Sequence, residues 1–293
     1  MKSTRLARLL IVGTCGVAGC LTIDPFFFNG SPVDGYDWDA DPADPDLEGE
    51  DTPLHPSKVP AAARIEALLD VDGRAVHYVY AHRPGAAATV FFSHGNTLHL
   101  GHYWERVEWL WERGFNVMVY DYPGYGLSTG DPDEASVFAN AAAALEVLPT
   151  LADFTPERVV FYGYSLGGAP TYEMALRGVE GEGLRPDAVV TESTFCSTDA
   201  MVEDGSFIGL SGSFLSHNPF DNCAKIGRLG DLPILILHGG ADSFVVPRHA
   251  HLLDEAAEGR ATLEIIPGAE HSTVPVVGGD AYWATMVDFL TGP

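Results

Sequence analysis

The sequence predicts one α/β domain, built on an eight-stranded, mostly parallel β-sheet with helices on both faces. The chain has 293 residues and 46% hydrophobic content, which is enough to bury the core of one such domain. From Lys58 onward, short runs rich in β-branched and aromatic residues alternate with segments whose apolar residues recur at helical spacing. This alternation is typical of a parallel sheet that is covered on both faces.

The expected elements follow one another in a regular order. Residues 64–82 read as two antiparallel strands that turn at Asp72-Gly73, a strong hairpin signal. Asp131 is expected to be the N-cap of the second helix, with Pro132 at its first position. The six further strands are expected at residues 89–95, 115–126, 158–165, 188–194, 232–242 and 261–268. The helices are expected at residues 102–114, 131–148, 166–178, 247–259 and 278–290.

The alternation breaks between Phe195 and Leu229. Glycine, serine and aromatic residues cluster there without a long periodic run. A segment of this length inside a compact domain is usually a lid or a binding loop. We therefore expect a lid at about residues 195–229, within a domain that spans residues 58–293.

The chain is strongly acidic, with a formal net charge of −25 from 41 acidic and 16 basic residues. Such a charge repels nucleic acid and anionic membrane surfaces, so it argues against nucleic acid as a partner. It says little about the substrate, because an acidic surface is also a common means of staying soluble.

The N-terminus has the layout of a secretory signal peptide: a basic start, a short apolar run and then small residues. The apolar run is too short to span a bilayer as a mature helix. Its last four residues, "VAGC" at 17–20, resemble a bacterial lipobox, in which cleavage before the cysteine leaves the thiol to carry diacylglycerol. We expect residues 1–19 to be removed and Cys20 to anchor the domain to a membrane of the bacterial cell envelope. The alternative is that Cys20 is only a small apolar residue of the signal.

Residues 20–57 are expected to form an acidic tether. Residues 21–57 contain ten Asp and Glu, no Lys or Arg, and prolines throughout, with little to bury. Charge repulsion and prolines would keep this segment extended and hold the domain away from the lipid. An acidic binding tail is the alternative.

Only two of the four cysteines, Cys196 and Cys223, belong to the expected folded domain. In an oxidising envelope these two can form a disulfide. Two buried free thiols are the alternative, since the sequence gives no distance between them.

Ser165 lies in a GxSxG pattern, Gly163-Tyr164-Ser165-Leu166-Gly167, directly after an expected strand and directly before a helix. The glycines permit a turn so tight that a Cβ on either side would collide with the strand or the helix. A serine hydroxyl needs a histidine base and a carboxylate to become a nucleophile, and both are expected further along the chain. Asp242 and His271 each follow a later strand, in the order Ser, Asp, His. We predict that these three residues form a catalytic triad.

The developing oxyanion also needs hydrogen-bond donors. The backbone N–H groups of Asn96, in the turn after the strand "TVFFS", and of Leu166, directly after Ser165, are the predicted donors. His94 is expected to brace the turn that contains Asn96.

A metal site is the competing interpretation of the histidines near this turn. His94, His99 and His102 lie near Asp121 in sequence, but their spacing matches no usual set of metal ligands. No metal is therefore expected.

Five segments, "SHGN", "DYPGYGLSTG", "GYSLGG", "LHGGADSFVVP" and "GAEHS", resemble the α/β-hydrolase superfamily in order and spacing, over about residues 64–291. The similarity is greatest to the BEM46-like, serine-aminopeptidase-related group. This resemblance implies the α/β-hydrolase fold and hydrolysis of esters, thioesters or amides through an acyl-enzyme, without a cofactor. The cysteines in the lid region, the acidic tether and the lipobox match no motif of the family.

We therefore predict a lipid-anchored serine hydrolase that cleaves small-molecule carboxylic (acyl) esters. A peptidase or amidase that uses the same triad is the alternative, because esters and amides react through the same tetrahedral species. A non-catalytic binding module of the envelope is a third hypothesis, since a fold alone does not prove activity. The oligomeric state is not predicted.

Overall fold

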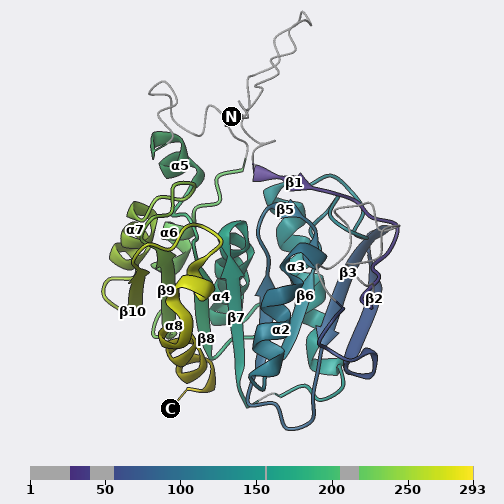
Figure 1. Cartoon of the computed structure of the whole chain (residues 1–293). Helices are drawn as coiled ribbons and strands as arrows, with labels where there is room; N and C mark the ends of the chain where they lie inside the picture. The colour runs from purple at the N-terminus through teal and green to yellow at the C-terminus, as the bar shows by residue number, and fades with distance from the viewer. Residues whose placement is uncertain (1–26, 40–55, 156, 205–217, 293) are drawn as a thin grey trace, which may run out of the picture.

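The computed structural model describes residues 27–39, 56–155, 157–204 and 218–292 (Figure 1). The predicted signal peptide, the predicted lipidation site Cys20 and residues 205–217 of the predicted lid lie outside the described residues. None of the helices in the described ranges combines the length and the apolarity needed to cross a membrane.

The core of the molecule is one eight-stranded sheet with the order β10-β9-β8-β7-β4-β6-β3-β2. Strand β3 is antiparallel to both of its neighbours, and every other pair is parallel. The central strands are buried along their whole length, which explains their continuous apolar sequences. The predicted α/β class and the mostly parallel eight-stranded sheet are confirmed. The strands are β2 (Arg64–Val71), β3 (Arg74–Ala81), β4 (Thr89–Ser93), β6 (Asn116–Tyr120), β7 (Val159–Tyr164), β8 (Ala188–Glu192), β9 (Ile234–Gly239) and β10 (Ala261–Ile266).

Helices cover both faces of this sheet, as predicted (Figure 1). Buried residues of α3, α4, α6 and α7 belong to the hydrophobic cluster on one face, and those of α2 and α8 belong to the cluster on the other. The short helix α5 lies close to one end of the sheet, where the parallel strands point (Figure 1). The helices are α2 (Trp104–Glu112), α3 (Glu134–Val147), α4 (Gly168–Glu180), α5 (Thr198–Asp204), α6 (Asn222–Ile226), α7 (Arg248–Ala256) and α8 (Val274–Thr291).

The start of α3 differs from the prediction by two residues. Asp133, and not Asp131, is the N-cap, because its side chain accepts a hydrogen bond from the Ser136 backbone N–H at 2.7 Å. The Ser136 hydroxyl in turn accepts from the Asp133 backbone N–H at 2.9 Å, which completes a capping box.

The prediction of a tether that continues to residue 57 is wrong for residues 27–39. Strand β1 (Asn29–Gly30) pairs in parallel with β5 (Thr97–Leu98), and both Phe27 and Trp38 are buried in the hydrophobic clusters. The physical reason is that aromatic side chains in this acidic segment supply enough apolar area to bury, although the average composition is polar.

Cys196 and Cys223 form a disulfide. It joins the segment that follows β8 to helix α6, and the backbone N–H of Cys223 also donates to the carbonyl oxygen of Cys196 at 3.0 Å. Of the two alternatives left by the sequence, the structure therefore contains the bridge and not the free thiols.

Candidate active site

Ser165 lies on a sharp turn between β7 and α4, at the end of the sheet toward which the parallel strands point (Figure 1). Its φ of 53° is in the left-handed region, which is unusual for a residue other than glycine. A Cβ at Gly163 would lie 2.5 Å from the carbonyl oxygen of Gly167, and a Cβ at Gly167 would collide with the carbonyl oxygen of Ser93. Both glycines are therefore required by the close packing of this turn.

The structure brings Ser165, His271 and Asp242 together, although they are far apart in sequence. The Ser165 hydroxyl lies 2.9 Å from Nε2 of His271, and Nδ1 of His271 lies 2.8 Å from Oδ2 of Asp242. Because a carboxylate can only accept, Nδ1 carries the hydrogen and Nε2 is free to accept the serine proton. The arrangement can therefore move a proton from the serine hydroxyl to the imidazole.

The Asp242 carboxylate is held in its ionised form. Burial alone would raise the pKa of Asp242, but hydrogen bonds from His238 and His271 outweigh this effect and hold the pKa below its usual value. Oδ1 also accepts from the backbone N–H groups of Phe244 and Val245, each at 2.9 Å. A fixed, ionised carboxylate orients the imidazole and stabilises its protonated form.

The backbone of His271 is held by two hydroxyl groups. Ser193 donates to the His271 carbonyl oxygen at 3.0 Å, and Tyr164 donates to the same oxygen at 3.3 Å. The ring of Tyr164 also packs against the imidazole, with ring centroids 5.4 Å apart. Tyr164 thus contacts the histidine while directly preceding the serine in the chain.

Tyr164 is supported in turn by a buried ion pair. The guanidinium group of Arg106 lies 4.1 Å from the centre of the Tyr164 ring, and its Nη1 lies 2.8 Å from Oε1 of Glu192. Oε2 of Glu192 accepts from the hydroxyls of Tyr162 at 2.9 Å and Tyr282 at 2.7 Å. We call these five residues the Arg106–Glu192 network.

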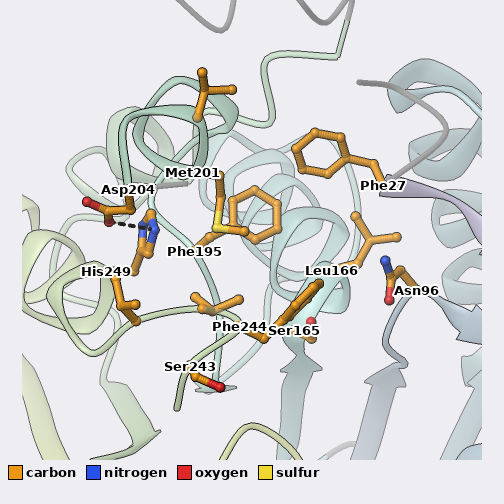
Figure 2. Close-up of a pocket in the computed structure, with 13 residues that line it drawn as sticks. Phe27, Asn96, Ser165, Leu166, Phe195, Met201, Asp204, Ser243, Phe244 and His249 are labelled. Atoms are coloured by element: carbon orange, nitrogen blue, oxygen red, sulfur yellow. Dashed lines mark ion pairs between the residues drawn. The ribbon is translucent and has the colours of Figure 1, made fainter. Parts of the chain in front are cut away.

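Asn96 and Leu166, the predicted oxyanion donors, lie beside Ser165 at one end of a cavity (Figure 2). The turn that contains Asn96 is fixed because its carbonyl oxygen accepts from the Tyr125 hydroxyl at 3.0 Å. His94 is buried next to this turn, where its Nδ1 lies 2.7 Å from the carbonyl oxygen of Gly95. This contact fits the bracing role expected for His94.

The cavity that opens on Ser165 has a volume of about 350 Å³. Most of its wall is apolar, and helix α5 supplies Met201 and Val202 (Figure 2). Phe27 contributes from the N-terminal segment, which the sequence predicts to lie outside the domain. Among the described residues, the lining consists of Phe27, Asn96, Ser165, Leu166, Phe195, Met201, Val202, Asp204, Ser243, Phe244, Val245, Val246 and His249.

Asp121 and His99, two of the residues considered for a metal site, have other hydrogen-bond partners in the structure. Asp121 lies 2.8 Å from Nδ1 of His77 and accepts from the Leu100 backbone N–H, while Nδ1 of His99 accepts from the Gly101 backbone N–H. Within the part of the chain that the structure describes, no group of three or more His, Cys, Asp or Glu side chains is placed to hold a metal ion.

Comparison with known proteins gives one consistent family. Residues 90–229 match the alpha/beta hydrolase family. The uncharacterized protein YfhR of Escherichia coli (strain K12) is 34% identical over 209 residues, which is 70% of each chain. The alpha/beta hydrolase domain-containing protein 17B of Xenopus tropicalis is 30% identical over 211 residues, 71% of this chain and 68% of its own.

Solved structures share the fold at lower sequence identity. The esterase Pf2001 of Pyrococcus furiosus has a TM-score of 0.64 and 19% identity, over 90% of this chain and 97% of the esterase. Est1E from Butyrivibrio proteoclasticus has a TM-score of 0.59 and 17% identity, over 78% of this chain and 99% of its own. The eight-stranded sheet, the serine on a strand-to-helix turn and these relatives agree with one another. The chain therefore belongs to the α/β hydrolase family and has the α/β-hydrolase fold.

Proposed function

We propose that this protein is a serine hydrolase that cleaves carboxylic (acyl) esters of small molecules through an acyl-enzyme. The observation that carries the proposal is the pair of hydrogen bonds that joins Ser165 to His271 and His271 to Asp242. Ser165 also lines a largely apolar cavity. The structural neighbour Pf2001 is an esterase, which supports esters as the substrate class.

In this mechanism, the Ser165 hydroxyl oxygen attacks the ester carbonyl carbon while Nε2 of His271 takes its proton. The tetrahedral intermediate then expels the alcohol, which receives that proton from His271. Water repeats the same two steps on the acyl-enzyme and releases the acid. Asp242 remains ionised throughout and stabilises the imidazolium that forms at each step.

The backbone N–H groups of Asn96 and Leu166 are the proposed donors to the developing oxyanion. Their position next to Ser165 in the cavity wall supports this role. One such donor typically contributes about 3 kcal/mol to the stabilisation of the transition state.

The test is hydrolysis of a short p-nitrophenyl ester by the purified protein. We expect turnover by the wild type and none above background by Ser165→Ala, with circular dichroism showing that the variant is folded. Ser136→Ala, on helix α3, is the matched control and should retain turnover. Equal activity in Ser165→Ala and the wild type would disprove the assignment.

The peptidase or amidase alternative uses the same residues, so it is tested with substrates and not with variants. A panel that compares acyl esters with aminoacyl amides should show faster Ser165-dependent turnover of the esters. Faster turnover of the amides would move the protein to the peptidase class. A protein that turns over neither set would be the non-catalytic binding module.

We also propose that Cys20 carries a lipid that anchors the domain to a membrane of the bacterial cell envelope. The signal-like leader and the "VAGC" tetrapeptide support this proposal. Because Phe27 is already packed against the domain, the connecting chain reaches at most about 25 Å, which would keep the active site close to the membrane surface. Wild-type protein should fractionate with membranes and be released by detergent, and Cys20→Ser should be soluble. Soluble wild-type protein with an unmodified Cys20 would contradict the anchor.

A further inference from the structure

The cavity that opens on Ser165 ends in two polar groups, the buried His249 and the partly exposed Asp204. Figure 2 shows them at the end of the cavity away from Ser165 and Asn96, with Met201 and Phe195 between the two ends. His249 is fully buried, and it reaches the cavity from helix α7, while Asp204 is the last residue of α5. An apolar cavity with polar groups at one end favours apolar ligands that carry a polar group at the matching position.

The hydrogen positions on His249 follow from its neighbours. The backbone N–H of Cys196 donates to Nδ1 at 3.2 Å, so Nδ1 is the acceptor of the ring. Burial lowers the pKa of His249 to about 4, so the ring is neutral near pH 7 and its one hydrogen is on Nε2. The ring therefore offers a single N–H donor at the cavity end.

This donor and its neighbouring acceptor are both unsatisfied. Nε2 of His249 lies 3.2 Å from Oδ2 of Asp204, yet neither atom has a hydrogen-bond partner of acceptable geometry among the residues that the structure describes. The other carboxylate oxygen, Oδ1, is 2.8 Å from Nη1 of Arg248. Buried polar groups without partners are rare in native proteins, and each one costs free energy. The pair is thus arranged for a ligand group that supplies one acceptor and one donor.

A hydroxyl group meets this requirement best. Its oxygen accepts from the N–H at Nε2 of His249, and its hydrogen goes to Oδ2 of Asp204. A carboxylate at the same place would be repelled by Asp204, and an ammonium group would leave the N–H at Nε2 without an acceptor.

We propose that the His249–Asp204 pair is a hydroxyl-binding subsite, and that the preferred substrates are esters whose apolar acyl chain carries a hydroxyl group at its far end. This inference rests on the proposed esterase function. The acyl chain, and not the alcohol, is assigned to the cavity because the acyl group stays bonded to Ser165 through the intermediate, at the point where the cavity opens.

The test uses matched p-nitrophenyl esters of straight-chain acids with roughly six to ten carbons, each with and without a terminal hydroxyl. At the chain length that reaches the pair, we expect the hydroxylated ester to have a kcat/KM about tenfold higher than that of the plain ester. A factor of this size is what the net free energy of about one hydrogen bond gives. His249→Phe should abolish this preference, so that the hydroxylated and the plain ester have the same kcat/KM. Asp204→Ala should reduce the preference too, and it provides a second readout if His249→Phe does not fold.

Two neighbouring substitutions are the matched controls. His251→Phe on α7 and Glu203→Ala on α5 change exposed residues of the same helices and should keep the preference for the hydroxylated ester. The subsite is refuted if no chain length shows a preference, as expected where the pair only holds water. A preference that survives both His249→Phe and Asp204→Ala would refute it equally.

A binding measurement separates this inference from the proposed function. Calorimetry with Ser165→Ala and the methyl esters of the same acids needs no turnover. The hydroxylated ester should bind about tenfold more tightly, and His249→Phe in the same background should remove the difference. Equal affinities would overturn the subsite even if the wild type proves to be an active esterase.

Discussion

Replacing Arg106 by methionine tests the Arg106–Glu192 network, in which Tyr164 contacts the backbone of His271. The Arg106 side chain is 9% exposed and that of Glu192 is not exposed at all, so both charges are removed from water. Arg106→Met leaves the Glu192 carboxylate with the hydroxyls of Tyr162 and Tyr282 as donors but without its cation. Breaking a buried ion pair from one side costs about 3–5 kcal/mol, because the remaining charge is uncompensated.

The expected size of the effect is large enough to measure by urea unfolding. If the free energy of unfolding falls by about 2–3 kcal/mol per molar urea, the midpoint of unfolding should fall by roughly 1–2.5 M. The double variant Arg106→Met, Glu192→Met should be less destabilised than the sum of the single variants, because it removes both charges together. The matched control is Arg113→Met, since Arg113 also stacks on an aromatic ring, that of Trp283, but is exposed. It should cost less than about 1 kcal/mol.

The same variant should affect the reaction through Tyr164. Loss of the guanidinium group beneath the Tyr164 ring loosens a residue that holds the His271 carbonyl oxygen, so kcat should fall by about tenfold or more at little change in KM. Arg106→Lys should restore part of the stability and of kcat, because it returns the charge. A cost below about 1 kcal/mol for Arg106→Met, or fully additive costs in the double variant, would refute the account of a buried, coupled pair.

Three further predictions concern other parts of the structure. Trp38→Ala should lower the free energy of unfolding by about 3–5 kcal/mol in urea titrations, because Trp38 is buried and donates to Glu66; an effect below about 1 kcal/mol would show that the N-terminal segment is not part of the folded domain. Reduction of the Cys196–Cys223 bridge should cost about 3.5 kcal/mol for its separation of 27 residues, measured as a lower urea midpoint in dithiothreitol, whereas the Cys196→Ala, Cys223→Ala variant should not respond to the reductant. His249 should make the fold sensitive to acid: its folded pKa of about 4 lies below the unfolded value of 6.5, so the unfolded state takes up the proton first as the pH falls. Stability should therefore decrease between about pH 6.5 and pH 4 by up to about 3 kcal/mol, and the same decrease in His249→Phe would show that other groups cause it.

The sheet and the position of Ser165 could be predicted because their signals are local. Strands such as β4 and β7 are continuous apolar runs, and the glycines around Ser165 follow from the turn itself. Asp242 and His271 could be located because the ends of parallel strands meet at one edge of the sheet. The predicted N-cap of α3 lies two residues before the observed one. Two aspartates, Asp131 and Asp133, precede the helix, and the sequence alone does not show which of them accepts from Ser136.

The features that were missed depend on contacts between distant segments. Phe27 and Trp38 lie in an acidic stretch whose average composition hides the burial of a few aromatic side chains. The pairing of Arg106 with Glu192 joins residues from α2 and β8, and no pattern within either element indicates it. The cavity end formed by His249 and Asp204 likewise exists only once α5 and α7 are side by side. These contacts arise from tertiary packing, which periodicity does not encode.

The central claim is that Ser165 is a nucleophile activated by His271 and Asp242, and its most direct test is labelling with a fluorophosphonate probe. We predict one covalent adduct on the folded protein, mapped by mass spectrometry to Ser165, with its rate strongly reduced in His271→Ala and no adduct in Ser165→Ala. A folded wild-type protein that is not labelled, or an adduct that persists in Ser165→Ala, would contradict the claim.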